Sequence, residues 1–365
     1  MLTEHFHNTQ KDTGHYSNDL RYVLSLQNTI AAFEEIKTWE GYAKTPLHSL
    51  DSMASDIGVK NIYYKDESSR FGLGSFKALG GTYGVLKFIH HALKKEIGDE
   101  VSMKDIHAGK YSEQISKYTV TTATDGNHGR SVAFGAKLFG CKCQIYIHSE
   151  VSSGRQKAME DLEATVNRVS GNYDESLQIC IEDAGKNNWY VISDTSYEGY
   201  TKYPRYIMAG YNVMAEEIID QIKDRPLPTH VFLQGGVGSF PGAICGYFWE
   251  KFPGNNIKFV VVESEHAPCL IRSAQNNQMT SVNIKQETMM AGLSCGEPSL
   301  LGWEILKSGT DDFITINDSS IPGLMRLLAE NNLKIEAGES SVAGLAGLIE
   351  SMEDQKIAEA MELNK

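Results

Sequence analysis

Short apolar runs alternate with helical patterns along most of the chain. The runs lack the polar alternation of half-exposed strands and are typical of strands buried on both faces. They cover residues 61–64, 118–123, 143–148, 190–193, 230–233 and 258–263. Apolar residues recur with helical spacing at 78–97, 128–139, 152–162, 200–222 and 240–252. The order strand, helix, strand predicts parallel sheets with right-handed crossovers, and hence an α/β fold.

Two polar segments interrupt this alternation. Residues 98–117 contain few apolar positions and are interpreted as an insertion or a mobile connection. Residues 223–229 hold Pro226 and Pro228, which is typical of a short connection before a strand.

Length and composition narrow the class of protein. A chain of 365 residues is long enough for two domains that each bury a core. The net charge of -13 disfavours nucleic acid as a partner, although a local basic pocket can exist on an acidic protein. No apolar run reaches the length of a membrane span, residues 1–20 are polar, and six cysteines are too few for a disulfide framework. We therefore expect a cytoplasmic protein with reduced thiols.

A lysine stands at the start of one helical pattern. The sequence Ser75-Phe76-Lys77 follows Gly72 and Gly74. The Lys77 amine in this position can reach back past the glycine loop toward a ligand. A solvated lysine on the first helical turn is the alternative.

A polar turn, residues 124–129, directly follows the predicted strand that ends at 123. Ligands of open α/β sheets bind just beyond the carboxyl ends of strands. Asp125, Asn127 and His128 would supply an acceptor, donors and a titratable ring there. An Asn-capped helix start explains the same residue types, so both interpretations stay open.

A glycine-rich loop, residues 234–239, joins the strand at 230–233 to the next helical pattern. Three glycines let successive N–H groups converge on an anion, and the N-terminus of the following helix adds its positive end. The spacing fits neither a Walker loop nor the dinucleotide fingerprint. A tight strand-to-helix turn is the alternative.

Together, the three motifs predict one cofactor, pyridoxal 5'-phosphate (PLP). Its aldehyde bonds to a lysine amine and its phosphate is held by backbone amides. The side-chain amide of Asn127 can donate a hydrogen bond to the ring hydroxyl.

The order of SFK, GNHG and GGVGS resembles that of the fold-type II PLP enzymes, which include serine and threonine dehydratases, threonine synthase and cysteine synthase. Within this superfamily the chain is most similar to the diaminopropionate ammonia-lyases. The resemblance covers nearly the whole chain and is carried by residues 65–81, 122–140, 194–204, 290–299 and 338–348. Asp125 is the most telling position, because simple dehydratases more often have a small residue there.

The resemblance implies an architecture and partners. Two open, twisted, mainly parallel sheets flanked by helices would hold the cofactor between two domains. Residues 1–84 and 205–365 would form the large PLP-binding domain, and residues 85–204 the small one. The protein would be a homodimer acting in amino-acid catabolism on a small amino acid, with no metal, nucleic acid or membrane partner.

The resemblance also implies roles for residues that hold the cofactor. Lys77 would bond to it covalently and, once freed by substrate, move a proton at the α-carbon. Phe76 would pack against its ring, and Asn127 would bind the ring hydroxyl. The phosphate would be held by Gly235, Gly236, Val237, Gly238 and Ser239.

Two carboxylates would complete the site. Asp125, on the face opposite Lys77, would bind the β-amine of the substrate or remove the α-proton of the opposite enantiomer. Asp194 is a second candidate for holding the β-ammonium group. A helix N-cap before Thr195 is the alternative for Asp194.

The implied reaction is α,β-elimination of D- and L-2,3-diaminopropionate to pyruvate and two ammonia, with serine as a poorer substrate. A serine or threonine dehydratase is the first alternative. The second is a truncated, non-catalytic PLP-binding protein, because no strand that would bring a partner to the pyridine nitrogen is visible between the pattern at 343–352 and Lys365. Cys269 and Cys295 are expected near the site as two thiols or, in an oxidised form, as a pair.

Overall fold

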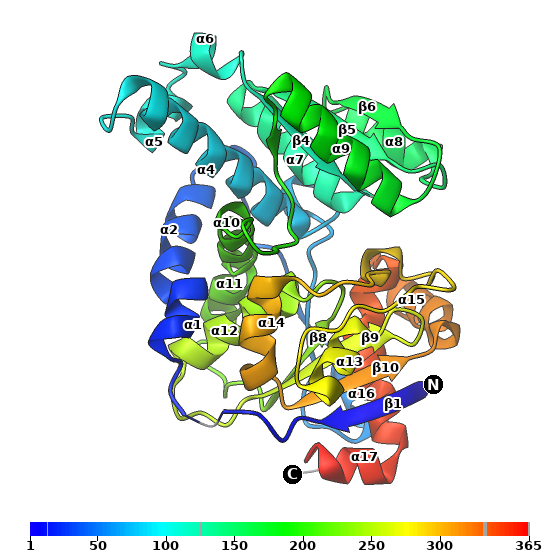
Figure 1. The fold of residues 1–365 in the computed structure, drawn as a ribbon. Coiled ribbons are helices and arrows are strands. Elements are labelled where there is room, and N and C mark those ends of the chain that lie inside the picture. Colours follow the sequence, from blue (N-terminus) through cyan, green and yellow to red (C-terminus); the bar gives the residue numbers. More distant parts are fainter. Residues whose placement is uncertain (13, 125, 331–333, 364–365) are drawn as a thin grey trace.

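The structure is a computed structural model that describes residues 1–12, 14–124, 126–330 and 334–363 (Figure 1). One four-stranded sheet has the order β1-β10-β9-β8. Strands β8, β9 and β10 are parallel, and β1 pairs antiparallel with β10. The bounds of these strands are β1 Leu2–His7, β8 His230–Gln234, β9 Lys258–Ser264 and β10 Asp312–Ile316.

A second four-stranded sheet has the order β6-β5-β4-β7 and is parallel throughout. Figure 1 shows it in a lobe above the first sheet, with α4 running up toward it. A short antiparallel pair, β2 and β3, stands apart from both. The bounds are β4 Thr119–Ala123, β5 Lys142–Ile147, β6 Thr165–Arg168, β7 Tyr190–Val191, β2 Leu47–Ser49 and β3 Tyr63–Lys65.

Helices cover both sheets and connect their strands (Figure 1). The α-helices are α1 Asn18–Val23, α2 Leu26–Ile36, α3 Asp51–Ile57, α4 Lys77–Ile97, α5 Met103–His107, α6 Ser112–Ile115, α7 Asn127–Phe139, α8 Ser153–Glu160, α9 Tyr173–Asn187, α10 Lys202–Tyr211, α11 Val213–Gln221, α12 Ser239–Lys251, α13 Cys269–Asn276, α14 Leu300–Gly309, α15 Ile321–Glu330, α16 Ala343–Glu353 and α17 Gln355–Ala360. Short 3₁₀ turns are η1 Arg70–Gly72, η2 Ala291–Leu293, η3 Asp318–Ser320 and η4 Glu339–Val342. Among the described residues, no helix has both the length and the apolar composition needed to cross a bilayer.

The predicted α/β class with mainly parallel sheets is confirmed. Every residue of β4 and β10 is buried, as strands covered on both faces require. The helical pattern at 200–222 forms two helices, α10 and α11, that meet at Asn212. The predicted boundary at 84/85 lies inside α4, and the domain limits stay a prediction.

Part of the predicted insertion at 98–117 folds into packed helices. This segment contains α5 and α6, and Ile106 and Ile115 are buried in the main core. It is therefore a structured part of the upper lobe and not merely a connection.

Close packing of two helices fixes where the site lies. A Cβ added to Gly80 on α4 would meet Cε1 of Tyr211 at 2.4 Å, and one added to Gly210 on α10 would meet the carbonyl oxygen of Leu79 at 2.7 Å. Only glycine permits such a close approach of two backbones. The crossing brings the N-terminus of α4, with Lys77, next to the C-terminus of α10, with Tyr211.

Candidate active site

A cleft of about 1850 Å³ is lined by residues of both lobes. The sequence motifs reach it from separate elements. Lys77 lies at the start of α4, and Asn127 at the start of α7, where the chain leaves the parallel sheet of the upper lobe. The glycine loop after β8 faces the same cleft from the other lobe. The three predicted motifs are therefore brought together.

The Lys77 amine is ion-paired with Asp194. Its Nζ donates a hydrogen bond to Oδ2 of Asp194, which also accepts one from the Tyr211 hydroxyl at 3.3 Å. The side chains of Lys77 and Asp194 are 25% and 14% exposed, so the pair is largely shielded from water but open to the cleft. The alternative of Asp194 as an N-cap is wrong, because the next helix, α10, begins only at Lys202.

Charges around Asp194 keep its carboxyl group ionised. Burial alone would raise the pKa of Asp194, but the interactions with His128 and Lys77 outweigh it and hold this pKa well below its usual range. The site therefore holds a fixed negative charge that can bind an ammonium group.

His128 turns one ring nitrogen toward the same carboxylate. Its Nε2 donates to the carbonyl oxygen of Ile192 at 2.8 Å, since a carbonyl can only accept. Burial lowers the pKa of His128 despite the nearby Asp194 carboxylate, so the ring is neutral at neutral pH and adds its positive charge beside Asp194 only in acid. In the neutral form the lone pair of Nδ1 points into the site, where it lies 3.6 Å from Oδ2 of Asp194. An ammonium group placed there would meet two acceptors.

The glycine loop could cradle an anion with its backbone amides, although the N–H groups of Gly235 and Gly238 already donate to the carbonyl oxygens of Val262 and Gly235. Gly236 and Gly238 have φ values of +60° and +94°, a region that side chains disfavour. The loop ends at the N-terminus of α12, where unpaired N–H groups and the helix dipole attract an anion. Ser239, the first residue of α12, donates its hydroxyl to the carbonyl oxygen of Asp194 at 2.6 Å. The cradle is thus tied directly to the Lys77–Asp194 pair.

The buried Glu263 side chain packs against Gly235 of the glycine loop. A Cβ on Gly235 would meet Cγ of Glu263 at 2.6 Å, so only glycine fits above this carboxyl group. The carboxyl oxygens of Glu263 accept from the backbone N–H groups of Leu270 and Ile271 at 2.8 Å each. Burial raises the pKa of Glu263 to about 8.

Two further predicted residues face the cleft. The Phe76 ring is half-buried against Tyr211 and Phe240, with ring centroids 5.0 Å and 4.6 Å away. Asn127 is exposed on the first turn of α7. Asp125, the predicted second base, lies outside the described residues.

Two residues of the site, Tyr211 and Glu263, were missed from the sequence, whereas His128 was predicted as a titratable ring of the polar turn. Tyr211 lies in a helical pattern that gives no sign of its hydroxyl's partner. Glu263 did leave a signal, an acid at the end of the apolar run 259–262.

The structure also has all six cysteines as thiols, with Cys269 buried.

Comparison with known proteins agrees with this site. The sequence profile of the family described as "Pyridoxal-phosphate dependent enzyme" matches residues 38–361. The diaminopropionate ammonia-lyase of Escherichia coli K12 is 37% identical over 333 residues, which is 89% of this chain and 82% of that enzyme. The enzyme of Salmonella typhimurium is 36% identical over 356 residues, 94% of this chain and 88% of that enzyme.

Solved structures lead to the same family. The Escherichia coli diaminopropionate ammonia-lyase in complex with an aminoacrylate-PLP azomethine reaction intermediate has a TM-score of 0.88 and 34% identity, and the match covers 100% of this chain and 91% of that one. Its complex with D-serine gives a TM-score of 0.87. Threonine deaminase isoform 2 of Solanum lycopersicum, 19% identical with a TM-score of 0.75, shares the fold. The chain therefore belongs to the pyridoxal-phosphate-dependent enzymes of fold type II and, within them, to the diaminopropionate ammonia-lyase family.

Proposed function

We propose that this protein eliminates ammonia from D- and L-2,3-diaminopropionate, with Lys77 as the lysine that carries PLP. With one water consumed, the products are pyruvate and two ammonia. The observation that carries the proposal is the Lys77–Asp194 ion pair beside the glycine cradle, to which Ser239 ties it. A carboxylate that already holds one ammonium group suits a substrate with an amino group on its β-carbon.

The residues present fit PLP. The cradle of residues 235–239 offers amides and a helix N-terminus to a phosphate, and Lys77 offers an amine to an aldehyde. Asn127 would donate to the ring hydroxyl and Phe76 would shield one side of the ring from water. When bound, PLP supplies an electron sink for the charge that develops at the α-carbon.

The chain's own groups would then bind the substrate and move its protons. Lys77, freed as an amine, would take the α-proton on its side. Asp194 and Nδ1 of His128 would accept hydrogen bonds from the β-ammonium group that leaves as ammonia. Tyr211 would keep the Asp194 carboxylate in place through its 3.3 Å hydrogen bond.

A substrate panel tests the proposal. Purified protein loaded with PLP should release pyruvate from both enantiomers of diaminopropionate faster than from serine or threonine. Faster turnover of serine or threonine would favour a dehydratase. A yellow protein whose colour is discharged by borohydride but which turns over none of them would favour a non-catalytic PLP-binding protein.

Asp125 is proposed as the base that removes the α-proton of one enantiomer of the substrate. Asp125→Asn keeps size and polarity but removes the proton acceptor, so turnover of the D enantiomer should fall by about 100-fold. The L enantiomer, served by Lys77 on the opposite face, should lose less. Equal losses for both enantiomers would make Asp125 a binding group, and no loss would make the turn only structural.

The glycine cradle gives a prediction on cofactor affinity. Gly236→Val places a β-branched side chain at φ +60°, where the added Cβ lies 3.3 Å from the carbonyl oxygen of Gly292. PLP affinity, measured by equilibrium titration of absorbance, should fall by roughly tenfold or more, which corresponds to a loss of at least about 1.4 kcal/mol of binding free energy. Gly185→Val, at a helical position with open space around it, is the matched control and should bind PLP normally. Unchanged affinity in Gly236→Val would move the phosphate site elsewhere.

We further propose that the protein is a cytoplasmic homodimer. The resemblance supports the dimer, and large apolar side chains such as Tyr22 and Ile30 are exposed on α1 and α2. Sedimentation at micromolar concentration should give twice the chain mass of 40.4 kDa, and a mass of one chain would refute the dimer.

A further inference from the structure

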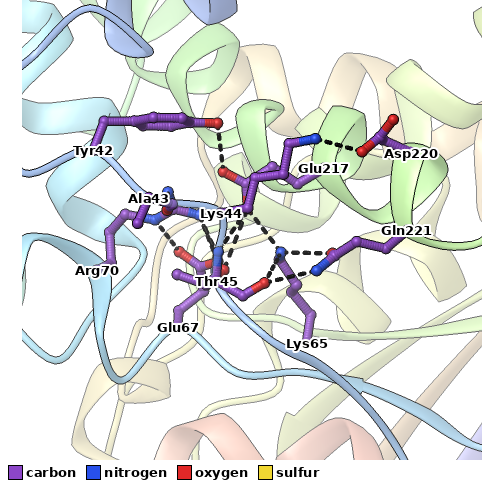
Figure 2. Close-up of polar contacts among 10 residues, drawn as sticks. All are labelled: Tyr42, Ala43, Lys44, Thr45, Lys65, Glu67, Arg70, Glu217, Asp220 and Gln221. Carbon is purple, nitrogen blue, oxygen red and sulfur yellow. Dashed lines mark hydrogen bonds and ion pairs between the residues drawn. The ribbon is translucent and has the colours of Figure 1, made fainter.

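Four buried charged side chains, three from the start of the segment that leads to Lys77 and one from α11, form a network of ion pairs. They are Lys65, Glu67, Arg70 and Glu217, which we call the charged quartet (Figure 2). The side chains of Arg70 and Glu217 are 0% exposed, and those of Lys65 and Glu67 are 9% and 10% exposed. Two cations face two anions, so the quartet is neutral when all four are ionised.

Arg70 joins two carboxylates that come from different elements. Its Nη2 donates to Oε2 of Glu217, on α11, at 2.8 Å. The same guanidinium holds both oxygens of Glu67, from Nε at 2.8 Å and from Nη2 at 2.9 Å. Such two-pronged contacts fix orientation as well as distance.

Lys65 completes the connection to α11. Its Nζ donates to Oε2 of Glu217 at 2.7 Å and to Oε1 of Gln221 at 3.0 Å. Burial alone would raise the pKa of Glu217, but Arg70 and Lys65 outweigh it and this pKa is lowered. The quartet thus ties the end of β3 and the turn after it to one helix (Figure 2).

The segment between the quartet and Lys77 contains backbone conformations that contacts with the rest of the fold must stabilise. Phe71, Gly72 and Gly74 have φ values of +49°, +69° and +66°. A phenylalanine in this region is strained, so surrounding contacts must hold it there. Aromatic packing provides part of this stabilisation, because the Phe71 ring lies 6.0 Å from that of Trp39 and 5.5 Å from that of Phe134, measured between centroids.

Both ends of this segment rest on one pair of consecutive helices. The quartet binds the first end to Glu217 on α11. At the other end, Phe76 packs against Tyr211, the last residue of α10. The Tyr211 hydroxyl also donates a hydrogen bond to Asp194, the ion-pair partner of Lys77. Only Asn212 separates α10 from α11, so a shift of one anchor relative to the other would move Lys77 within the cleft.

We propose that Arg70 and Glu217 are positioning residues that set the place of the Lys77 amine through residues 65–77. This inference rests on the proposed role of Lys77. A quartet that only stabilised the fold would change the melting temperature and leave the chemistry of the folded enzyme alone.

The test compares Glu217→Gln with Asp220→Asn, a matched carboxylate-to-amide change on the same helix. Asp220 pairs with Lys44 outside the quartet, and their side chains are 56% and 45% exposed. In the PLP-loaded enzyme, kcat for diaminopropionate should fall by about 10- to 100-fold in Glu217→Gln, with KM nearly unchanged, because small misplacements of a reacting group have effects of this size. The pH titration of the cofactor absorbance, which reports the surroundings of the Lys77 nitrogen, should also shift. Asp220→Asn should match the parent in both.

A second variant covers the case in which Glu217→Gln does not fold. Arg70→Lys keeps the charge but cannot hold two carboxylates with a planar fork, and it should lower kcat and shift the titration in the same way. A lower melting temperature with parental kcat and parental titration in the folded variant would overturn the proposal. A parent protein whose cofactor is fixed by borohydride to a residue other than Lys77 would instead refute the proposed function.

Discussion

Lys77→Ala is expected to abolish turnover of diaminopropionate, by roughly three orders of magnitude or more. The variant loses the amine that bonds to PLP and that takes the α-proton. It also leaves the buried carboxylate of Asp194 without its ammonium partner. Pyruvate release, followed together with the absorbance of the lysine-bound cofactor, measures both losses.

Lys77→Arg separates the two effects. Arginine keeps a positive charge beside Asp194 but cannot bond to an aldehyde, because its guanidinium stays protonated. It should therefore restore thermal stability and not activity. Lys44→Ala, at an exposed lysine, serves as the control and should keep full activity. Full turnover in Lys77→Ala would show that the cofactor-bearing lysine has been assigned wrongly.

Asp194→Asn is expected to weaken catalysis in a substrate-dependent way. The pKa of Asp194 lies well below its usual range, so the substitution removes a full negative charge at neutral pH. Loss of one partner of a largely buried charge pair costs at least about 2 kcal/mol, which is roughly a 30-fold loss in kcat/KM for diaminopropionate. Serine has no β-ammonium group and should lose about tenfold less, since it depends on Asp194 only through Lys77.

The comparison of the two substrates is the informative part of that experiment. Equal losses for diaminopropionate and serine would mean that Asp194 acts only by placing Lys77. Asp220→Asn, an exposed carboxylate-to-amide change, should affect neither substrate.

Burial alone did not decide which strands the sequence revealed, because the edge strands β7 and β8 were predicted whereas the fully buried β10 was missed. The run at 118–123 is continuously apolar or β-branched because β4 lies in the middle of its sheet, with β5 on one side and β7 on the other. Strand β1 was missed because an edge strand is partly exposed and tolerates the polar residues of Leu2–His7. Its partner β10, some 300 residues away, adds a long-range pairing that no local pattern contains.

The cofactor motifs were predictable because each stands where a strand or loop passes into a helix. What each side chain touches was not. Lys77 and Asp194 are 117 residues apart, and the α4–α10 crossing places Lys77 beside Tyr211, which also bonds to Asp194. Glu217 falls within the helical pattern at 200–222, and its burial depends on Arg70 and Lys65 from another part of the chain.

The ratio of ammonia to pyruvate released from diaminopropionate tests the central claim most directly. Purified, PLP-loaded protein should form two ammonia for each pyruvate from either enantiomer, and Lys77→Ala should form neither. Only one ammonia per pyruvate, or no pyruvate from a protein that has bound PLP through Lys77, would contradict the account.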